Sequence, residues 1–246
     1  MYIRSVKPRA IVIIAGLFLA VFSFFYVQTE GAADNASGSI GKVYNLAGGV
    51  IITRADGTKV AISKGTAIFQ DDVIETAADG KLGIVFNDDT TFSLGRDGRM
   101  VIDTMIYDAA ANTGESDIDV LAGTFSFVSG KIAKAGDDAM TVSTPVATIG
   151  IRGTQVGLHY EDGENLRVTL MEEADGMVGE VTITNSAGVQ VLNMPYAEVS
   201  IAGIGAAPSQ VYQVERAAMV SAYAGSLGYL PETTAGANRY QTPPQW

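Results

Sequence analysis

The sequence predicts an all-β fold in which short strands form a solenoid-like or sandwich arrangement. An N-terminal signal or anchor helix and one short C-terminal helix flank this part. Two observations predict the strands. From residue 41 onward, short segments rich in Val, Ile and Phe alternate apolar with polar residues, at the two-residue period of a β-strand. Asp-Gly pairs separate these segments, and Asp-Gly tolerates the positive φ angles of hairpin turns.

The alternation is clearest in residues 124–128, where Phe125 and Phe127 alternate with Thr124 and Ser126. Such a pattern turns one face of a strand inward and the other toward water. The same period occurs around residues 167–170 and 180–183. Further strands are expected at residues 50–54, 81–86, 100–106 and 117–121.

The expected turns are five Asp-Gly pairs, at Asp56-Gly57, Asp79-Gly80, Asp97-Gly98, Asp162-Gly163 and Asp175-Gly176. The first three lie about 20 residues apart, which is a loose repeat of the solenoid type. We therefore expect one β-rich domain over residues 41–201.

The N-terminus, residues 1–33, is expected to be a signal peptide or a single-pass membrane anchor. Arg4, Lys7 and Arg9 precede an uncharged apolar run at residues 10–27. Its length of about 18 residues lies between a cleaved signal and a spanning helix. Small residues at 31–33 suit signal peptidase, so both outcomes stay open. Either one places the rest of the chain in the periplasm, soluble or anchored in the inner membrane, after a flexible leader at residues 34–40.

The C-terminal part changes character. Val211, Val214, Ala218 and Ala222 have near-helical spacing and predict a short helix over residues 209–228. Residues 231–246 contain Thr, Gly and Pro without periodicity, and are expected to be a disordered tail.

Composition excludes several classes of function. The formal net charge of −11 repels phosphate backbones, so nucleic acid is not expected as a partner. The chain has no cysteine, which excludes disulfides, thiol catalysis and thiolate metal sites. No phosphate-binding loop, haem motif or zinc cluster is present, so no cofactor is expected.

Catalytic candidates are weak. His159 is the one histidine and lies on an expected strand without a Gly-x-Ser-x-Gly motif. Adjacent carboxylates that could cleave glycosides occur at Asp71-Asp72, Asp88-Asp89, Asp137-Asp138 and Glu172-Glu173. Adjacent residues on a strand point to opposite faces, so such a pair does not converge on one substrate. Asp-rich turns could bind calcium, but no EF-hand or calcium β-roll spacing is present.

A set of ordered motifs covers residues 41–160. Its most specific parts are DDVIET, which ends at Thr76, and TPVATIGIRGT at residues 144–154. The other parts are GKVYNLAGG at 41–49, LGIVFNDDTTFSL at 82–94, MVIDTMIYD at 100–108 and LAGTFSFVSGK at 121–131. Together they resemble the FecR domain, the β-rich periplasmic domain of bacterial iron-transport signalling regulators.

The resemblance implies short strands in a solenoid-like arrangement, no catalytic site, and a signal passed across the envelope through protein contacts. The expected partner is a membrane signalling protein or a transporter. The regulators that give the family its name carry a cytoplasmic segment that contacts a sigma factor, and nothing comparable precedes Ala10. Any signalling role is therefore expected to need another protein.

The closing motif supplies the candidate structural or contact residues, which are Thr144, Pro145, Gly150, Arg152, Gly153 and Thr154. Thr144-Pro145 is expected to hold the chain extended. Gly150 and Gly153 permit close backbone packing. Arg152 has two interpretations: a buried side chain that pairs with a carboxylate and fixes the register of the last strand, or a contact to a ligand or partner.

The sequence thus favours an exported FecR-type binding or signalling module of the bacterial cell envelope without catalysis. A structural or adhesion protein that binds itself or polysaccharide is the alternative. An envelope hydrolase is a second alternative.

Overall fold

The computed structural model describes residues 38–136, 139–161, 164–232 and 240. The expected signal or anchor segment and most of the expected leader lie outside the described residues. Within the described part, no helix has the length and apolar character needed to cross a membrane.

The described chain forms two open sheets that share β9 (Thr113–Val128). In spatial order, sheet A contains β4 (Ala67–Ile68), β1 (Gly41–Ala47), β6 (Lys81–Phe86), β7 (Thr91–Leu94), the second half of β9, β12 (Gln155–Glu161), β13 (Asn165–Met171), β16 (Ala197–Ile201) and β17 (Tyr212–Gln213). Sheet B contains β3 (Lys59–Val60), β2 (Val50–Thr53), β5 (Val73–Thr76), β8 (Arg99–Asp108), the first half of β9, β10 (Met140–Thr144), β11 (Ala147–Arg152), β14 (Glu180–Asn185) and β15 (Gly188–Leu192).

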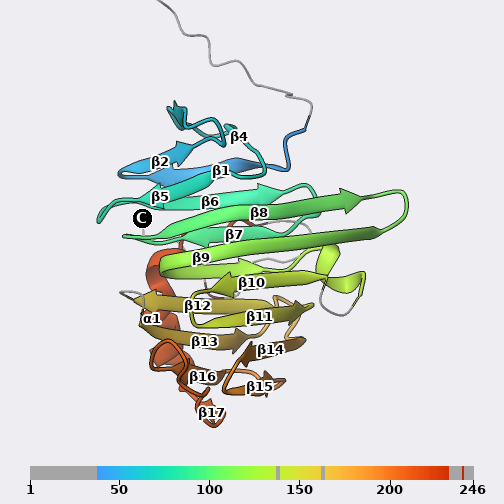
Figure 1. The fold of residues 1–246 in the computed structure, drawn as a ribbon, viewed down its shortest axis with the longest axis vertical. Helices are drawn as coiled ribbons and strands as arrows, with labels where there is room; N and C mark the ends of the chain where they lie inside the picture. Colours follow the sequence, from blue (N-terminus) through green and yellow to red (C-terminus); the bar gives the residue numbers. More distant parts are fainter. Residues whose placement is uncertain (1–37, 137–138, 162–163, 233–239, 241–246) are drawn as a thin grey trace, which may run out of the picture. The chain divides into compact units, whose positions relative to one another are not determined.

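The strands are stacked along the long axis of the described part roughly in sequence order, an arrangement that we call the ladder. Successive segments of the chain alternate between the two sheets, so strands close in sequence lie close in space (Figure 1). Neighbouring strands are antiparallel, except that β9 and β10 are parallel. The inner faces of both sheets bury one continuous apolar core. The expected all-β fold is confirmed in that the described chain consists mostly of strands in open sheets over one apolar core, with one C-terminal helix.

β9 joins the two sheets. Its first half pairs with β8 and β10, and its second half pairs with β7 and β12. At the change from one sheet to the other, Gly123 has a φ of +110°, and an added Cβ would lie 2.5 Å from the Cα of Gly98. Only glycine tolerates both conditions, so this position fixes where the strand changes sheets.

The aromatic residues predicted at 124–128 do face the core. Phe125 and Phe127 are fully buried together with Phe92 of β7. The rings of Phe92 and Phe127 stack with centroids 5.0 Å apart, and Phe125 approaches Phe92 edge-on at 5.7 Å. Stacked and edge-on pairs are the favoured aromatic geometries, so these three rings stabilise the centre of sheet A.

Four of the five expected Asp-Gly turns are present. Residues 56–57, 79–80, 97–98 and 175–176 each connect successive elements of the chain. Gly57 and Gly176 have positive φ, and in the third pair Asp97 itself takes a φ of +52°. The pair at 162–163 lies outside the described residues.

The C-terminal helix is shorter than predicted. α1 spans Arg216–Leu227, and β17 occupies part of the segment expected to be helical. Residues 212–214 instead extend sheet A beside β16, where the N–H of Val214 donates to the carbonyl of Tyr196. Ala218 and Ala222, two of the residues whose spacing predicted the helix, are exposed. The helix buries Met219, Tyr223, Ser226 and Leu227.

The tail is anchored at one described residue. The Tyr240 ring is buried among Met171, Met219 and Tyr223, and its hydroxyl accepts a hydrogen bond from the N–H of Glu172 at 3.0 Å. The expectation of disorder is therefore wrong at Tyr240. Residues 233–239 and 241–246 lie outside the described part of the chain.

Candidate functional site

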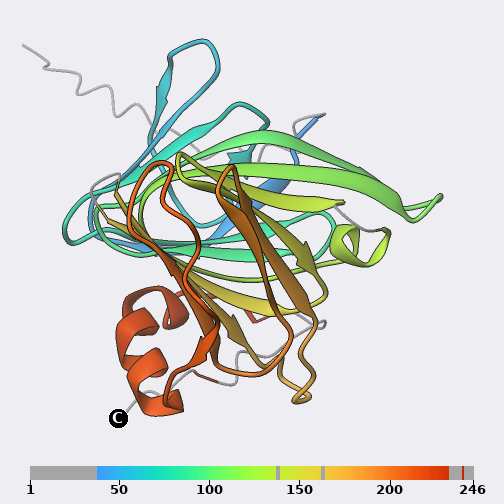
Figure 2. The same cartoon turned by 60° about the horizontal axis from the view of Figure 1, so that its bottom comes forward.

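The larger of two hollows described for the chain is a cleft of about 650 Å3 between α1 and one end of sheet A. Its walls come from β6, the β7–β8 turn, the centre of β9, the end of β12 and the exposed side of α1. α1 contacts β6, β7 and β9, and Figure 2 shows the helix beside the last, orange strands of the chain. We call this hollow the cleft.

His159 lies on the wall of the cleft. It is on β12, an interior strand of sheet A, directly across from Thr124 of β9. The His159 Nδ1 and Thr124 Oγ1 atoms lie 2.7 Å apart, and Nε2 lies 3.0 Å from Oε1 of Glu161. The His159 side chain is 17% exposed and that of Glu161 is 67% exposed, so the imidazole is held at the base of the wall and the carboxylate reaches solvent.

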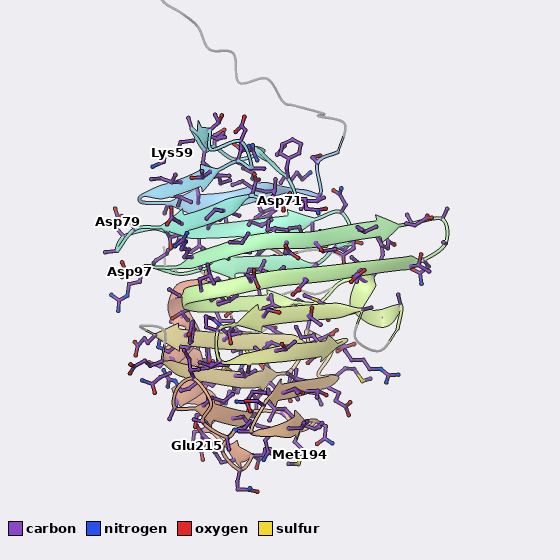
Figure 3. The ribbon with its side chains drawn as sticks, in the orientation of Figure 1. Lys59, Asp71, Asp79, Asp97, Met194 and Glu215 are labelled. Atoms are coloured by element: carbon purple, nitrogen blue, oxygen red, sulfur yellow. The ribbon has the colours of Figure 1, made fainter. Side chains whose placement is uncertain are left out.

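The rim of the cleft carries both signs of charge. Arg96 and Asp97 lie side by side in the exposed β7–β8 turn, and Figure 3 shows Asp97 on the same side of the strands as Asp79. Lys81 contributes an ammonium group that lies 5.3 Å from the ring centroid of Tyr229. With Glu161, these groups can match a polar partner surface that presents charges of both signs.

Thr124, His159 and Glu161 place a hydroxyl, an imidazole and a carboxylate next to one another, which is the set of groups in a catalytic triad. In a catalytic triad the carboxylate is buried and hydrogen-bonded, because it must orient the ring. Here the carboxylate is mostly in solvent, and its contact with Nε2 lacks hydrogen-bond alignment. The arrangement therefore links β9 with β12 at the cleft rather than orienting a base for attack.

Beneath α1, the outer face of sheet A carries a row of small side chains, one from each successive strand. The row consists of Gly83, Ser93, Ser126, Gly157 and Thr169, joined by the strand register. An added Cβ at Gly157 would lie 2.8 Å from the Tyr223 ring, and one at Gly83 would lie 2.2 Å from the carbonyl oxygen of Tyr229. The small-residue row therefore lets the helix approach the sheet closely and form one wall of the cleft.

At Thr169 the row joins a polar network that runs from the buried Tyr223 to the more exposed Tyr212. The Thr169 hydroxyl donates to Oε2 of Glu198 at 2.6 Å and lies 2.9 Å from the Tyr223 hydroxyl. The Tyr212 hydroxyl donates to Oε1 of Glu198 at 2.7 Å. Burial strongly raises the pKa of Tyr223, so its hydroxyl stays protonated. The network fixes α1 to β13 and β16.

The first part of the closing motif forms a tight hairpin. Thr144 ends β10 in extended conformation, as expected, but Pro145 and Val146 form the turn that leads into β11. The Thr144 hydroxyl accepts from the N–H of Ala147 at 3.0 Å and donates to its carbonyl at 2.9 Å. The residue before Pro145 thus closes the hairpin, which is a structural role.

The second part returns the chain from sheet B to sheet A. Gly150 is half-buried in β11, and Gly153 has a φ of +57° at the crossing. Thr154 is fully buried, and its N–H donates to the Ser129 hydroxyl at 2.8 Å. Arg152 is exposed at the end of β11, so it is not the buried side chain that one interpretation expected. Its pairing with a carboxylate and its role as a partner contact both stay predictions.

The adjacent carboxylates separate, as expected from their spacing. Asp72 and Asp88 are buried, whereas Asp71 is exposed and Asp89 is half-buried. Asp72 forms an ion pair with Arg54 and accepts from the N–H of Phe69 at 2.9 Å. Burial raises the pKa of Asp72 in spite of the arginine.

Glu173 is likewise buried, while Glu172 accepts a hydrogen bond from the Tyr196 hydroxyl. The pair at 137–138 lies outside the described residues. The three described pairs therefore do not present two carboxylates to one cavity. In the described part of the chain, no three His, Asp or Glu side chains converge as metal ligands.

The fold and cleft define a two-sheet β protein with a polar cleft. Residues 72–174 match the family model described as FecR protein. This match confirms the resemblance to the FecR domain over that stretch, which runs from the end of the β4–β5 loop past β13. No curated protein matches the chain.

Among solved structures, two crystal structures of a candidate anti-sigma factor from Parabacteroides distasonis ATCC 8503 are similar. The first has a TM-score of 0.48 and 13% identity, with 61% of this chain and 64% of that chain covered. The second has a TM-score of 0.47 and 13% identity, with coverage of 60% and 62%. A cell surface anchoring domain matches at a TM-score of 0.25 and 27% identity, with 26% of this chain and 83% of that chain covered. The chain thus spans less than two thirds of the length of the first of these.

Sequence reasoning missed most of the cleft. It singled out His159 but not Glu161, two residues further along β12, nor Lys81 and Arg96, which come from other elements. A usable signal was present, because Gly or Ser recurs at the outward positions of consecutive strands around Phe92, Phe125 and Val156. Small residues on an outward face indicate that another element covers that face.

Proposed function

We propose that the chain is an exported FecR-type binding or signalling module of the bacterial cell envelope, which acts through protein contacts without catalysis. The observation that carries this proposal is the family match over residues 72–174. The basic start and apolar run before residue 28 support export to the periplasm, either soluble or anchored in the inner membrane. The partner is a membrane signalling protein or a transporter.

We place the partner contact at the cleft. Its rim carries exposed groups of both charges, including Arg96, Asp97 and Glu161. Ser221 and Ala222 on the exposed side of α1 complete the rim. Both the FecR-matched strands and the C-terminal helix therefore contribute to one surface.

Site-specific cross-linking in cells tests this proposal. A photoreactive amino acid replaces Ser221 at the cleft in a C-terminally tagged chain, and proteins captured on illumination are identified. The same amino acid at exposed Lys59 in β3 is the matched control, because Lys59 lies at the opposite end of the ladder from Glu215, the residue just before α1 (Figure 3). We expect an inner-membrane sensor or an outer-membrane transporter to be captured from position 221 and not from position 59.

A second variant separates charge recognition from proximity. Arg96→Glu reverses one exposed charge in the cleft without touching the core. Loss of the captured partner in this variant supports recognition at the cleft. Recovery only of surface polysaccharide or of the chain itself from both positions contradicts the proposal and favours the structural or adhesion role.

A further inference from the structure

The two sheets have four lateral edges in the described part of the chain, and three of them are short. β3, β4 and β17 each contain two residues. β15, at the last edge of sheet B, contains five residues. Proteins limit unwanted strand pairing by keeping edge strands short or charged. β15 does neither.

The backbone of β15 is open for pairing. The turn at Ser186-Ala187 makes Asn185 and Gly188 the first hydrogen-bonded pair of the hairpin, because its loop has two residues. By the alternation of an antiparallel ladder, the N–H and C=O groups of Val189 and Val191 then point away from β14. No hydrogen bond to these groups from another described residue is present.

The side chains at this edge are apolar and exposed. Val189 is 57% exposed and Val191 is 40% exposed. Most other large exposed apolar side chains lie near in sequence, between Met177 and Tyr212, beyond the end of the FecR match. Figure 3 shows Met194 at the same end of the ladder as β15 in Figure 1.

Residues 186–196 contain no charged side chain, although the chain carries a net charge of −11. Two copies of such an acidic chain repel each other over most of their surfaces, because both carry negative charge. They can approach each other at a strand that carries no charge. The strand is also self-complementary, since Val189 and Val191 lie symmetrically about Gln190. These observations favour a second copy over a partner of opposite charge.

We infer that β15 pairs antiparallel with β15 of a second copy, which joins the two B sheets across a two-fold axis at Gln190. Val189 of one copy then lies opposite Val191 of the other, and each such pair exchanges backbone hydrogen bonds. The facing valines bury their exposed side chains as cross-strand pairs. This self-association is independent of the partner proposed for the cleft.

Sedimentation velocity of the purified full chain in mild detergent tests the dimer. Val189→Pro removes an N–H that faces the open edge and spares the ladder to β14, and Val191→Lys adds charge at an exposed position. We expect each variant to raise the dimer dissociation constant at least tenfold. Ile106→Lys, which alters a 59% exposed side chain of β8, is the matched control and is expected to leave the dimer unchanged.

A single cysteine tests the register, because the chain contains none of its own. In the inferred pairing, Gln190 faces Gln190 of the second copy as a non-hydrogen-bonded pair, with Cα atoms about 4.5 Å apart, within disulfide reach. We expect Gln190→Cys to form a disulfide-linked dimer on mild oxidation, and Ile106→Cys to form no disulfide-linked dimer, as judged by non-reducing denaturing electrophoresis. A monomeric parent chain, a dimer that the edge variants do not weaken, or no cross-link at position 190 would overturn the inference.

Discussion

The hydroxyl oxygens of Ser126 on β9 and Ser226 on α1 lie 2.8 Å apart in a fully buried contact, although 100 residues separate them. Ser126 belongs to the small-residue row, and Ser226 lies on the face of α1 turned toward it. The contact shows that only two short side chains separate the helix from the sheet at this point. Because the exposed side of α1 forms one wall of the cleft, the small-residue row determines the shape of the cleft.

Gly157→Ala is expected to displace α1. The added Cβ would lie 2.3 Å from Cε of Met171 and 2.8 Å from the Tyr223 ring, so the helix must move outward. Overpacking of this kind costs about 1–3 kcal/mol of unfolding free energy. Urea denaturation monitored by circular dichroism measures the loss.

Gly136→Ala is the matched control, since nothing lies within 4 Å of its added Cβ. The unfolding free energy of this variant is expected to stay within about 0.5 kcal/mol of the parent. Equal destabilisation by both substitutions would show that α1 does not depend on the small-residue row.

Tyr223→Phe is expected to lower the unfolding free energy by about 1 kcal/mol. The change removes a buried hydroxyl that lies 2.9 Å from Oγ1 of Thr169 and leaves the ring packing intact. Thr169 keeps its hydrogen bond to Glu198, so the loss stays modest. Thermal unfolding measures the effect, with Tyr44→Phe as a control at a half-buried tyrosine. An unchanged melting temperature would mean that the hydroxyl contributes nothing to holding the helix.

The strands were predictable because their pattern is local. Apolar residues at alternate positions around Phe125 and Phe127 place one face in the core, whatever the partner strand is. The turns at Asp56-Gly57 and Asp97-Gly98 were predictable for the same reason. The start of α1 was not, since Tyr212 and Gln213 join an edge strand whose partner, β16, must already be in place.

The cleft was not predictable, because it depends on contacts across long stretches of chain. Thr124 and His159 meet only when β9 has crossed into sheet A and β12 lies beside it. The exposure of Arg152 likewise depends on how β11 ends at the crossing to β12. Local patterns supply the strands, but their lateral order decides which polar groups come together.

Asp88→Ala is expected to lower the unfolding free energy by about 2–4 kcal/mol. The buried carboxylate accepts hydrogen bonds from the N–H of Thr90 at 2.9 Å, from the Thr90 hydroxyl at 2.7 Å and from the N–H of Ile132 at 3.2 Å. Its removal leaves buried donors without partners. The neighbouring substitution Asp89→Asn is the matched control, because it removes the charge from an ion pair with Lys131 that is about half exposed and keeps a side chain that tolerates the φ of +69° at this position. Chemical denaturation of both variants measures the difference, and similar losses would contradict the separation of this acidic pair into buried and surface roles.

Glu173→Gln is expected to stabilise the protein at neutral pH. Burial, with a smaller contribution from Asp175, raises the pKa of the Glu173 carboxyl above its usual value of 4.5, and Lys134 opposes the shift. The folded state therefore holds this proton more tightly than the unfolded state. As pH rises from 4.5 through the raised pKa, the parent chain loses unfolding free energy, and above that pKa the loss is complete.

Glutamine carries no charge at any pH, so the variant escapes this loss. Its melting temperature should exceed that of the parent at pH 7, and the advantage should shrink as pH falls toward 4.5. Glu232→Gln, which neutralises an exposed carboxylate, controls for the general effect of reducing the negative charge of the chain. Thermal unfolding of the three proteins across this pH range decides the matter. An advantage that grows toward low pH would mean that the attraction of Lys134, and not burial, dominates the ionisation of Glu173.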